Sequence, residues 1–377
     1  MVKPKRILII GLTERMGGVE TFIYNTTIFS DKTKYVYDYL VHGTDHCVFE
    51  SEINHFYNDG EQHIFFIRKY KENPVGCLCD LHNFYKRNGK KYDWIHFQSG
   101  STAEILYVFP FCIRYRIPVI SHSHNGNGYN PTVNRLFRTI VNMVTKKRLA
   151  CSEIAAEWLF GKKHVKETKI IINGIDTERF SYSPEARISV RDKYGIEENQ
   201  LVIGHIGRFS EQKNHSFIIE IFSEVKKKRD DAILLLVGVG ELMEDTKQKV
   251  KELNLDASVI FAGKQMRTED YYSAFDVFLM PSLYEGLPIV GVEAQSEGLD
   301  CFFSDTIDRQ ILITRRAHMV SLKNKATEWT ENILSNINTA SRSLSASEIC
   351  GGGYSIHSTL SSLQEVYGIG GHRIKES

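Results

Sequence analysis

Two carboxylates, Glu285 and Glu293, stand eight positions apart around a corner formed by Gly286, Leu287 and Pro288. The corner follows the apolar run Val277–Met280 and is typical of a turn from a strand into a helix. Pro288 suits the first turn of a helix, because its φ is already helical and its missing N–H costs nothing there. A helix N-terminus attracts phosphate, and carboxylates beside it accept hydrogen bonds from sugar hydroxyls. The stretch predicts a site for a ligand that is part phosphate and part sugar.

Two cations, Arg208 and Lys213, follow the apolar run Leu201–Gly207 and precede an apparent helix at Phe217–Arg229. Cations in loops are usually just solvated. Fixed at the C-terminal edge of a strand, however, they would neutralise a diphosphate. The chain has no Asp-x-Asp triplet, the carboxylate pair through which nucleotide-sugar enzymes commonly hold a divalent metal. We therefore expect protein cations and helix N-termini, and no metal, to neutralise the charge of the ligand.

A doubled glycine, Gly17-Gly18, lies in the loop after the first predicted strand, Arg6–Ile10. The G-x-G-x-x-G spacing of dinucleotide-binding loops is absent. The two glycines still let the backbone approach a ligand closely at a helix N-terminus. When the loop is considered alone, an ordinary turn between a strand and a helix explains it equally well. Glu20 in the first helical turn favours a functional interpretation.

Two histidines, His122 and His124, stand at the end of the predicted strand Pro118–His122, in the sequence His-Ser-His-Asn. Loops at this end of a strand carry ligand residues in α/β sheets. Two histidines two positions apart could bind a metal, but no third ligand lies near them in the sequence. A hydrogen bond to a ligand hydroxyl or phosphate is the favoured interpretation.

The overall composition is that of a globular protein with two domains. The chain has 377 residues, more than a single core usually supports, with 42% hydrophobic and 25% charged residues. A net charge of +1 argues against a nucleic-acid binder. Seven scattered cysteines form no disulfide framework, which predicts a cytoplasmic protein. No run reaches the roughly 20 apolar residues of a membrane span.

One apolar run, Ile105–Ile113, is followed by Arg114 and Arg116. It is too short to span a bilayer and is interrupted by proline, so we expect a buried helix. Peripheral contact with the inner face of the cell membrane is the alternative.

Strand and helix patterns alternate along the whole chain, which indicates parallel α/β layers. Helical patterns include Thr102–Tyr115 and Val133–Lys147. A polar segment, Ser181–Asn199, interrupts the alternation, which then restarts. We therefore predict two Rossmann-like domains, residues 1–180 and 181–355. The helix Ile356–Tyr367 could pack on either domain, and residues 356–377 are expected to complete the first.

Five elements in this order resemble glycosyltransferase family 4, the retaining nucleotide-sugar transferases of GT-B fold, and especially its bacterial members that build capsular polysaccharides or exopolysaccharides. The elements are Gly17–Glu20, His122–Asn125, Asn173–Asp176 with Phe180, Gly207–His215 and Glu285–Glu293. The resemblance covers nearly the whole chain. It implies an α/β GT-B fold, two Rossmann-like domains whose parallel sheets face each other across a cleft.

The resemblance also implies a role for each motif residue. Arg208 and Lys213 would hold the donor diphosphate and stabilise the departing nucleoside diphosphate. Glu285, with Gly286 and Leu287 beside it, would contact the donor sugar, and Glu293 the ribose. In the first domain, Gly17 and Gly18 would offer backbone groups near the phosphate, and His124 would face the donor sugar.

Together these features predict a metal-independent, retaining hexosyltransferase without a cofactor. Its donor would be a nucleoside-diphosphate sugar, with uridine or guanosine as the base. Its acceptor would be a saccharide, attached to a polyprenyl or other lipid, and its pathway capsule or exopolysaccharide biosynthesis. Two alternatives remain open: a sugar-nucleotide epimerase of the same fold, and a non-catalytic protein that binds sugar nucleotides.

Overall fold

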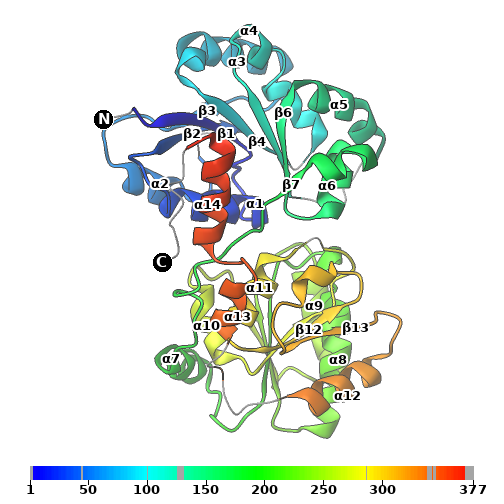
Figure 1. The fold of residues 1–377 in the computed structure, drawn as a ribbon. Helices are drawn as coiled ribbons and strands as arrows, with labels where there is room; N and C mark the ends of the chain where they lie inside the picture. Colours follow the sequence, from blue (N-terminus) through cyan, green and yellow to red (C-terminus); the bar gives the residue numbers. More distant parts are fainter. Residues whose placement is uncertain are drawn as a thin grey trace. The chain divides into compact units, whose positions relative to one another are not determined.

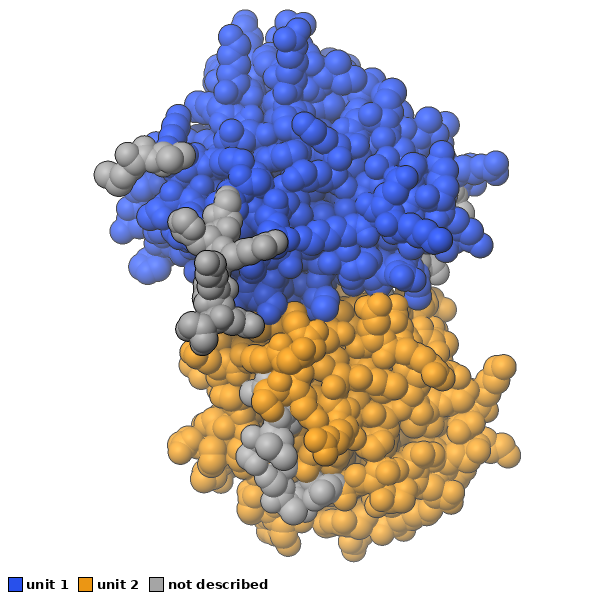
Figure 2. All heavy atoms as spheres, viewed as in Figure 1, with its two compact units in different colours: residues 1–174, 356–377 blue, residues 175–355 orange. Residues whose placement is uncertain are grey.

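The chain folds into two compact units, which Figure 2 colours separately. The structure is a computed structural model that describes residues 3–43, 46–99, 101–124, 131–285, 287–337, 342 and 345–369. Unit 1 comprises residues 1–174 and 356–377, and unit 2 residues 175–355. The sequence placed this junction at 180. In the structure Ile175 already belongs to unit 2, because its N–H donates to Tyr354 O (2.8 Å) and it pairs with Ser355.

Unit 1 is a parallel sheet covered by helices on both faces (Figure 1). Its described strands lie in the order β3-β2-β1-β4-β5-β6-β7. The strands are β1 Lys5–Ile10, β2 Tyr35–His42, β3 Ile64–Ile67, β4 Trp94–Ser99, β5 Val119–Ser123, β6 Thr145–Ala150 and β7 Lys169–Ile170. The helices are α1 Gly18–Ile28, α2 Glu50–Tyr57, α3 Pro74–Asn88, α4 Phe111–Arg114, α5 Pro131–Val144, α6 Glu153–Phe160 and α14 Ile356–Tyr367, with short 3-10 turns η1 Gly89–Lys91, η2 Thr102–Tyr107 and η3 Lys162–Glu167.

Two apolar cores fill the two faces of this sheet. On one face, Leu81 of α3 and Leu159 of α6 pack against Leu8 and Ile95. On the other face, α1 and the C-terminal helix α14 contribute Phe22, Leu363 and Tyr367, among others. The C-terminal helix, red in Figure 1, thus lies beside α1 and completes the first unit rather than the second.

Unit 2 repeats the same architecture. Its described strands lie in the order β10-β9-β8-β11-β12-β13, and every pairing is parallel. The strands are β8 Val202–Ile206, β9 Ile233–Val237, β10 Val259–Gly263, β11 Val277–Met280, β12 Asp300–Ser304 and β13 Ala317–Val320. The helices are α7 Pro184–Tyr194, α8 His215–Lys228, α9 Met243–Glu252, α10 Thr268–Ala274, α11 Ile289–Ser296, α12 Ala326–Asn336 and α13 Ser345–Gly351, with 3-10 turns η4 Glu211–Lys213 and η5 Arg309–Ile311.

Both sheets are Rossmann-like, as the sequence predicted. In each, the strand order reverses beside the first strand of the unit, between β1 and β4 and between β8 and β11. Ligands of such sheets bind outside the carboxyl ends of the strands at this reversal. Each unit therefore has one edge at which functional residues are expected.

One helix prediction for unit 1 was wrong, and another extended three residues too far. Thr102–Tyr115 is not one helix but η2 and α4, because the ring of Pro110 cannot continue a helix between them. The pattern Val133–Lys147 ends at Val144, where β6 begins and carries the basic residues Lys146–Arg148. Pairing of β6 between β5 and β7 overrides the local helical pattern.

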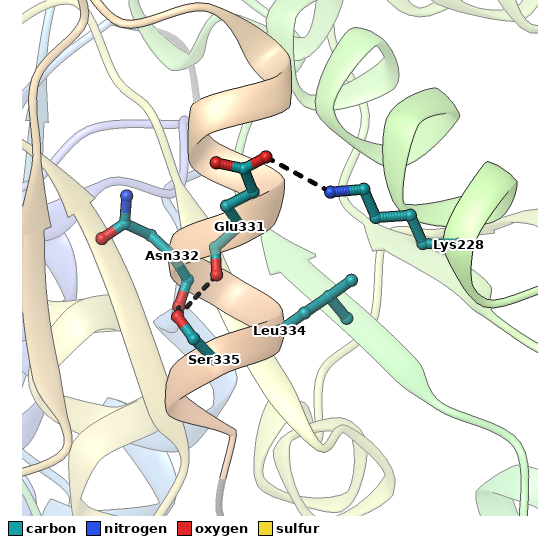
Figure 3. Close-up of a pocket in the computed structure, with 5 residues that line it drawn as sticks. All are labelled: Lys228, Glu331, Asn332, Leu334 and Ser335. Carbon is teal, nitrogen blue, oxygen red and sulfur yellow. Dashed lines mark hydrogen bonds and ion pairs between the residues drawn. The ribbon is translucent and has the colours of Figure 1, made fainter.

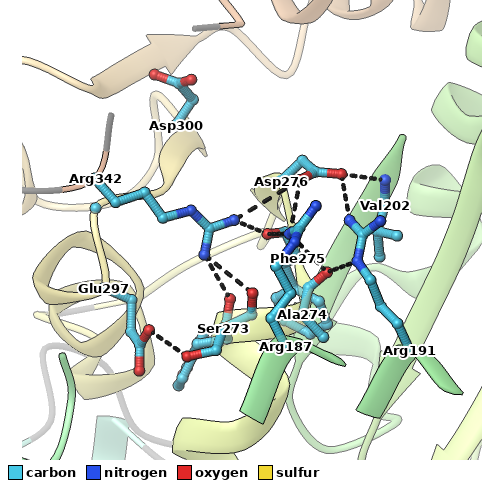
Figure 4. Close-up of polar contacts among 12 residues, drawn as sticks. Arg187, Arg191, Val202, Ser273, Ala274, Phe275, Asp276, Glu297, Asp300 and Arg342 are labelled. Atoms are coloured by element: carbon cyan, nitrogen blue, oxygen red, sulfur yellow. Dashed lines mark hydrogen bonds and ion pairs between the residues drawn. The ribbon is translucent and has the colours of Figure 1, made fainter. Parts of the chain in front are cut away.

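A buried group of charged residues fixes α7 to the sheet of unit 2 (Figure 4). Arg187 and Arg191 of α7 contact the carboxylate of Asp276 at 3.0 and 2.8 Å. The same carboxylate accepts the backbone N–H of Val202 at the start of β8, at 2.8 Å. Arg342 donates to Ser273 O (3.2 Å) from the opposite side. These bonds satisfy groups that would otherwise be buried without partners, and they hold α7, α10, β8 and β11 together.

None of the helices in the described parts of the chain is long and apolar enough to cross a bilayer.

Candidate active site

The central contact of unit 2 joins Lys213 to Glu285. The Lys213 Nζ lies 2.6 Å from Glu285 Oε1, and the two side chains are only 16% and 11% exposed. Lys213 ends the turn after β8, and Glu285 lies in the loop after β11. These strands are neighbours at the point where the strand order reverses. Two residues that the sequence selected separately thus meet at the expected ligand edge.

Backbone and amide bonds hold the two loops in this position. Gln212 Nε2 donates to Tyr284 O (3.0 Å), and Leu283 N donates to Gln212 O (2.8 Å). Asn214 Nδ2 donates to Pro281 O (3.1 Å). Asn214 itself adopts a left-handed conformation (φ 56°), which asparagine tolerates better than most residues. The turn that carries Lys213 is therefore bonded to the loop that carries Glu285.

Arg208 lies at the same edge but has a different partner. Its Nε donates to Glu241 Oε2 at 3.0 Å, and the two side chains are 59% and 53% exposed. Two glycines bring the Glu241 loop this close: a Cβ on Gly238 would lie 2.0 Å from Gly207 O, and one on Gly240 2.4 Å from Phe209 O. The solvated Arg208–Glu241 pair is weak, so this guanidinium can exchange its partner for an anionic ligand.

Glu293 is buried on α11, one helical turn beyond Pro288. Tyr272 Oη donates to Glu293 Oε2 at 2.9 Å. Burial disfavours the charged form and raises the pKa of Glu293 to about 7, although the Tyr272 hydrogen bond acts in the opposite direction. A carboxyl group with such a pKa near an open sheet edge is a candidate functional residue.

The corner between the two carboxylates differs from the prediction in one detail. Pro288 is the residue before α11 and has an extended ψ of 119°, so it lies outside the helix and not in its first turn. Leu287 is buried, and Gly286 lies outside the described residues. The backbone of the corner thus precedes the free N–H groups of α11.

In unit 1, Gly17 precedes α1 and Gly18 begins it. A Cβ on Gly17 would lie 2.8 Å from Glu20 Oε2, whereas a Cβ on Gly18 would meet nothing within 4 Å. The Glu20 side chain is occupied within the loop, because Thr13 Oγ1 donates to its Oε1 at 2.6 Å. A Cβ at position 17 would therefore displace the Glu20 carboxylate from its place beside Thr13, whereas one at position 18 would displace nothing.

His124 follows β5 at the ligand edge of unit 1. Its Nε2 donates to Gln98 Oε1 at 2.5 Å, because a carboxamide oxygen can only accept. Burial lowers the pKa of His124 to about 3, so the ring is neutral at physiological pH. The neighbouring ring of His122 lies 4.1 Å away, centroid to centroid. His124 is thus a neutral hydrogen-bonding group rather than a cation.

The hollow in Figure 3 is not part of this site. It measures 510 Å³ and is lined by Lys228, Glu331, Asn332, Leu334 and Ser335. Lys228 is the last residue of α8, whereas Lys213 lies just before the first. The hollow and the motif residues are therefore at opposite ends of that helix. Among the described residues, no group of three or more His, Cys, Asp or Glu side chains is arranged as metal ligands would be.

Sequence reasoning missed the partners of the motif residues. Glu241 is 33 residues from Arg208, and Tyr272 is 21 residues from Glu293. No local pattern indicates these two pairings. Only the order of the strands could have indicated them, since β9 and β11 both lie beside β8 in the sheet.

Comparisons with known proteins agree with this arrangement. Residues 187–314 match the family described as glycosyl transferases group 1, and residues 16–179 match glycosyltransferase family 4. The chain is 32% identical over 348 residues, 87% of either chain, to EpsF of Bacillus subtilis (strain 168), which is assigned as a glycosyltransferase. The chain belongs to glycosyltransferase family 4.

Two further relatives support the family and the fold. An Escherichia coli galactosyltransferase that acts on a diphosphoundecaprenol-linked sugar is 25% identical over 276 residues, covering 68% of this chain and 70% of that protein. The crystal structure of Anabaena HepE with UDP and glucose superposes with a TM-score of 0.81 over 97% of this chain and 99% of HepE, at 18% identity. The chain with the present sequence therefore has the GT-B fold, as predicted.

We predict that Glu293→Gln stabilises the protein at high pH. The native state holds the Glu293 proton up to about pH 7, whereas the unfolded chain releases it near 4.5. Stability is therefore lost as the pH rises from 4.5 to 7, by up to about 3 kcal/mol. Melting temperatures of both proteins at pH 5 and pH 8 measure this. The melting temperature of the variant minus that of the wild type should be several degrees larger at pH 8 than at pH 5.

A matched control is Glu252→Gln at the exposed end of α9. Its melting temperature should differ from that of the wild type by the same amount at both pH values. If the melting temperature of Glu293→Gln also differs from that of the wild type by the same amount at both pH values, the native wild-type protein does not hold the Glu293 proton.

Proposed function

We propose that this enzyme transfers a hexose-type sugar from a nucleoside diphosphate to a saccharide acceptor, with retention of configuration. The observation that carries this proposal is the Lys213–Glu285 contact, with Arg208 nearby, at the ligand edge of the unit 2 sheet. A cation pair suited to phosphate and a carboxylate suited to sugar hydroxyls lie on adjacent loops. A diphosphate-linked sugar needs both kinds of group next to each other.

Charge on the leaving group explains why the cations matter. As the bond between the anomeric carbon and the phosphate oxygen breaks, the sugar becomes oxocarbenium-like and negative charge grows on the diphosphate. Preorganised cations aimed at that charge lower the barrier, and this is usually the largest contribution to catalysis. Arg208 and Lys213 exchange Glu241 and Glu285 for phosphate oxygens and act without a metal ion.

The remaining motif residues bind the rest of the donor. Glu285, released from Lys213, accepts hydroxyls of the sugar, with the backbone of Gly286 and Leu287 alongside. Glu293 accepts the ribose hydroxyls in its ionised form. In unit 1, Gly17 and Gly18 approach the phosphate and acceptor, and His124 contacts the sugar. The acceptor oxygen bonds to the anomeric carbon from the face that the diphosphate leaves, and its proton passes to the departing phosphate oxygen.

Relatives suggest the substrates and the pathway. The Escherichia coli relative uses UDP-galactose and a lipid-linked acceptor, and HepE binds UDP-glucose. EpsF is the relative with the longest match among those compared above. These names favour a uridine diphosphate donor, a polyprenyl-linked saccharide acceptor, and a role in exopolysaccharide or capsule assembly on the cytoplasmic side of the membrane.

We predict that Arg208→Ala abolishes transfer while the fold survives. A panel of UDP-glucose, UDP-galactose, UDP-N-acetylglucosamine and GDP-mannose first identifies the donor, because a ligand of the native state raises its melting temperature. Release of diphosphate is then measured with a GlcNAc-diphospholipid acceptor. The loss of one cation should slow turnover at least about a hundredfold.

The control is Arg229→Ala, which removes an arginine at the far end of α8 that is paired with Asp231. It should keep wild-type turnover. Wild-type turnover by Arg208→Ala would contradict the proposal, as would an inverted anomer in the product. An epimerised donor formed without any acceptor would identify an isomerase instead.

We also propose that α3 and α4 of unit 1 contact anionic lipid. Val75, Leu78 and Ile113 are 73%, 47% and 58% exposed. The two helices are adjacent, because Tyr85 of α3 stacks on Phe111 of α4. Exposed cations lie on the same two helices and in the turns that follow them: Lys86, Arg87, Lys90, Lys91, Arg114 and Arg116. Apolar groups with a basic rim suit the surface of an acidic bilayer.

Flotation with vesicles tests this contact. Wild-type protein should bind vesicles that contain about a third of anionic lipid, and less so at high salt. Lys86→Glu with Lys90→Glu should weaken binding about tenfold or more, since each cation near the surface contributes about 1 kcal/mol. The control pair, Lys163→Glu with Lys251→Glu, carries the same charge change on other exposed sites. Equal binding by both pairs would exclude this surface.

A further inference from the structure

A histidine between two carboxylates lies in unit 1, at the end of the sheet opposite the ligand edge. His63 directly precedes β3. Its Nδ1 lies 2.9 Å from Asp38 Oδ1 and 3.2 Å from Tyr37 O, and its Nε2 lies 3.1 Å from Asp59 Oδ2. The side chains of His63 and Asp38 are each 2% exposed, whereas that of Asp59 is 43% exposed. The ring thus joins β2 to the loop that follows α2.

Both nitrogens of the His63 ring carry a proton, because each faces oxygen atoms that accept hydrogen bonds. The carboxylate of Asp38 also accepts from Arg6 Nε at 2.9 Å, so it acts as an acceptor toward the ring as well. Burial raises the pKa of Asp59, but the hydrogen bonds from the Glu61 N–H and from His63 lower it by more. A neutral imidazole would turn a bare nitrogen toward one of these carboxylates. The ring between them is therefore an imidazolium.

The surroundings of the ring favour this positive charge. Burial lowers the pKa of His63, but the hydrogen bonds to Asp38 and Asp59 outweigh that effect and raise the pKa above its usual 6.5. Tyr57 of α2 stacks on the ring, 3.9 Å between centroids, as aromatic rings do on cations. The other charged or titratable groups of this cluster, from β1, the loop before β3 and the start of β4, are Arg6, Glu61, Asp93 and Tyr92.

Loss of one proton would affect the two contacts of the ring unequally. Asp38 is buried and cannot move to water, so Nδ1 keeps its proton. Nε2 then becomes a bare acceptor that faces the carboxylate of Asp59, and two acceptors at this distance repel each other. Asp59 is partly exposed, so its side chain can turn to solvent. The contact that opens is therefore the one that holds the loop after α2.

Helix α2 is attached to the ligand edge at its other end. Val48, just before the helix, donates its N–H to Thr13 O at 2.9 Å, and Thr13 lies in the loop after β1. The ring of Phe49 stacks on Tyr24 of α1, 4.3 Å between centroids. A change in how firmly His63 holds the end of α2 thus acts on a segment that is bonded to a loop of the ligand edge.

We propose that His63 is a proton-dependent clasp for α2. The doubly protonated ring fixes residues 58–62 to β2, and loss of the Nε2 proton to water releases this loop and the last turn of the helix. The clasp belongs to unit 1 and does not depend on the proposed function. A permanent ion pair is the competing interpretation, and it requires the ring to stay doubly protonated over the whole pH range in which the protein is folded.

The protonation of the ring can be measured in the full-length protein. Long-range proton–nitrogen spectra of ¹⁵N-histidine-labelled protein distinguish protonated from bare ring nitrogens, and His63→Gln assigns the signals. We expect two N–H groups on His63 at about pH 5.5 and loss of the Nε2 proton above pH 6.5 and below about pH 9. Asp59→Ala removes one acceptor and should lower the pKa of His63. A ring that is neutral at pH 5.5, or still doubly protonated at pH 9, would overturn the proposal.

Hydrogen exchange followed by mass spectrometry measures the release itself. After correction for the intrinsic pH dependence, exchange in residues 50–62 should be about tenfold faster at pH 9 than at pH 5.5, the effect of one lost hydrogen bond to a charged group. Exchange in α8 serves as the internal reference. In Asp59→Ala the segment should exchange equally fast at both pH values. The control Asp256→Ala, in an exposed turn of unit 2, should behave as the wild type.

Stability gives an independent readout with a defined sign. The unfolded chain binds this proton only below about pH 6.5, so the clasp adds stability that is complete below that pH and is lost as the pH rises through the native pKa. The melting temperature of the wild type minus that of Asp59→Ala should therefore be larger at pH 5.5 than at pH 9. An equal difference at both pH values, or deprotonation of His63 without faster exchange in residues 50–62, would overturn the clasp.

Discussion

The ion pair between Lys213 and Glu285 is the interaction on which the rest of the site depends. It joins the loops after β8 and β11, the two strands between which the order of the sheet reverses. Both groups are largely removed from water, so each needs a charged or hydrogen-bonding partner. Without ligand they satisfy each other, which keeps a cation and a carboxylate in place and in low dielectric. In the proposed complex a diphosphate-linked sugar offers each of them another partner, phosphate oxygens for Lys213 and hydroxyls for Glu285. The resting contact therefore prepares the groups that the proposed reaction uses.

Each unit places its own functional groups through buried polar bonds. In unit 2, the Asp276 cluster fixes α7 and the start of β11, and Tyr272 on the neighbouring helix α10 holds Glu293. In unit 1, Tyr367 joins α14 to His96 and so to the ligand edge. Such bonds are costly to leave incomplete, and they allow few alternative arrangements of the residues they connect. The last helix of the chain is thus part of the support for histidines that stand far earlier in the sequence.

The fold and the motif residues could be predicted because they depend on local patterns. Alternating strands and helices indicate parallel sheets, and the carboxyl ends of parallel strands meet at one edge, which selected Arg208, Lys213 and Glu285. What the sequence could not provide was contact between distant residues. Lys213 and Glu285 are 72 residues apart, and their pairing follows from strand order alone. The contact between Glu293 and Tyr272 also joins residues that are distant in the sequence, so no local pattern could predict it. The strand β6 was missed because its basic residues Lys146–Arg148 continue a helical pattern, and only pairing with β5 and β7 makes them a strand.

The most direct test of the central claim is the calorimetric affinity for UDP and GDP in excess EDTA, for wild type and Glu285→Gln. In the proposed function protein cations hold the diphosphate, so we expect one of these nucleotides to bind wild-type protein equally well with EDTA and with Mg²⁺. Glu285→Gln should bind it at least as tightly, since Lys213 no longer has a competing carboxylate. Binding that requires Mg²⁺, or that disappears in Glu285→Gln, would contradict the claim that Lys213 passes from its carboxylate to the diphosphate.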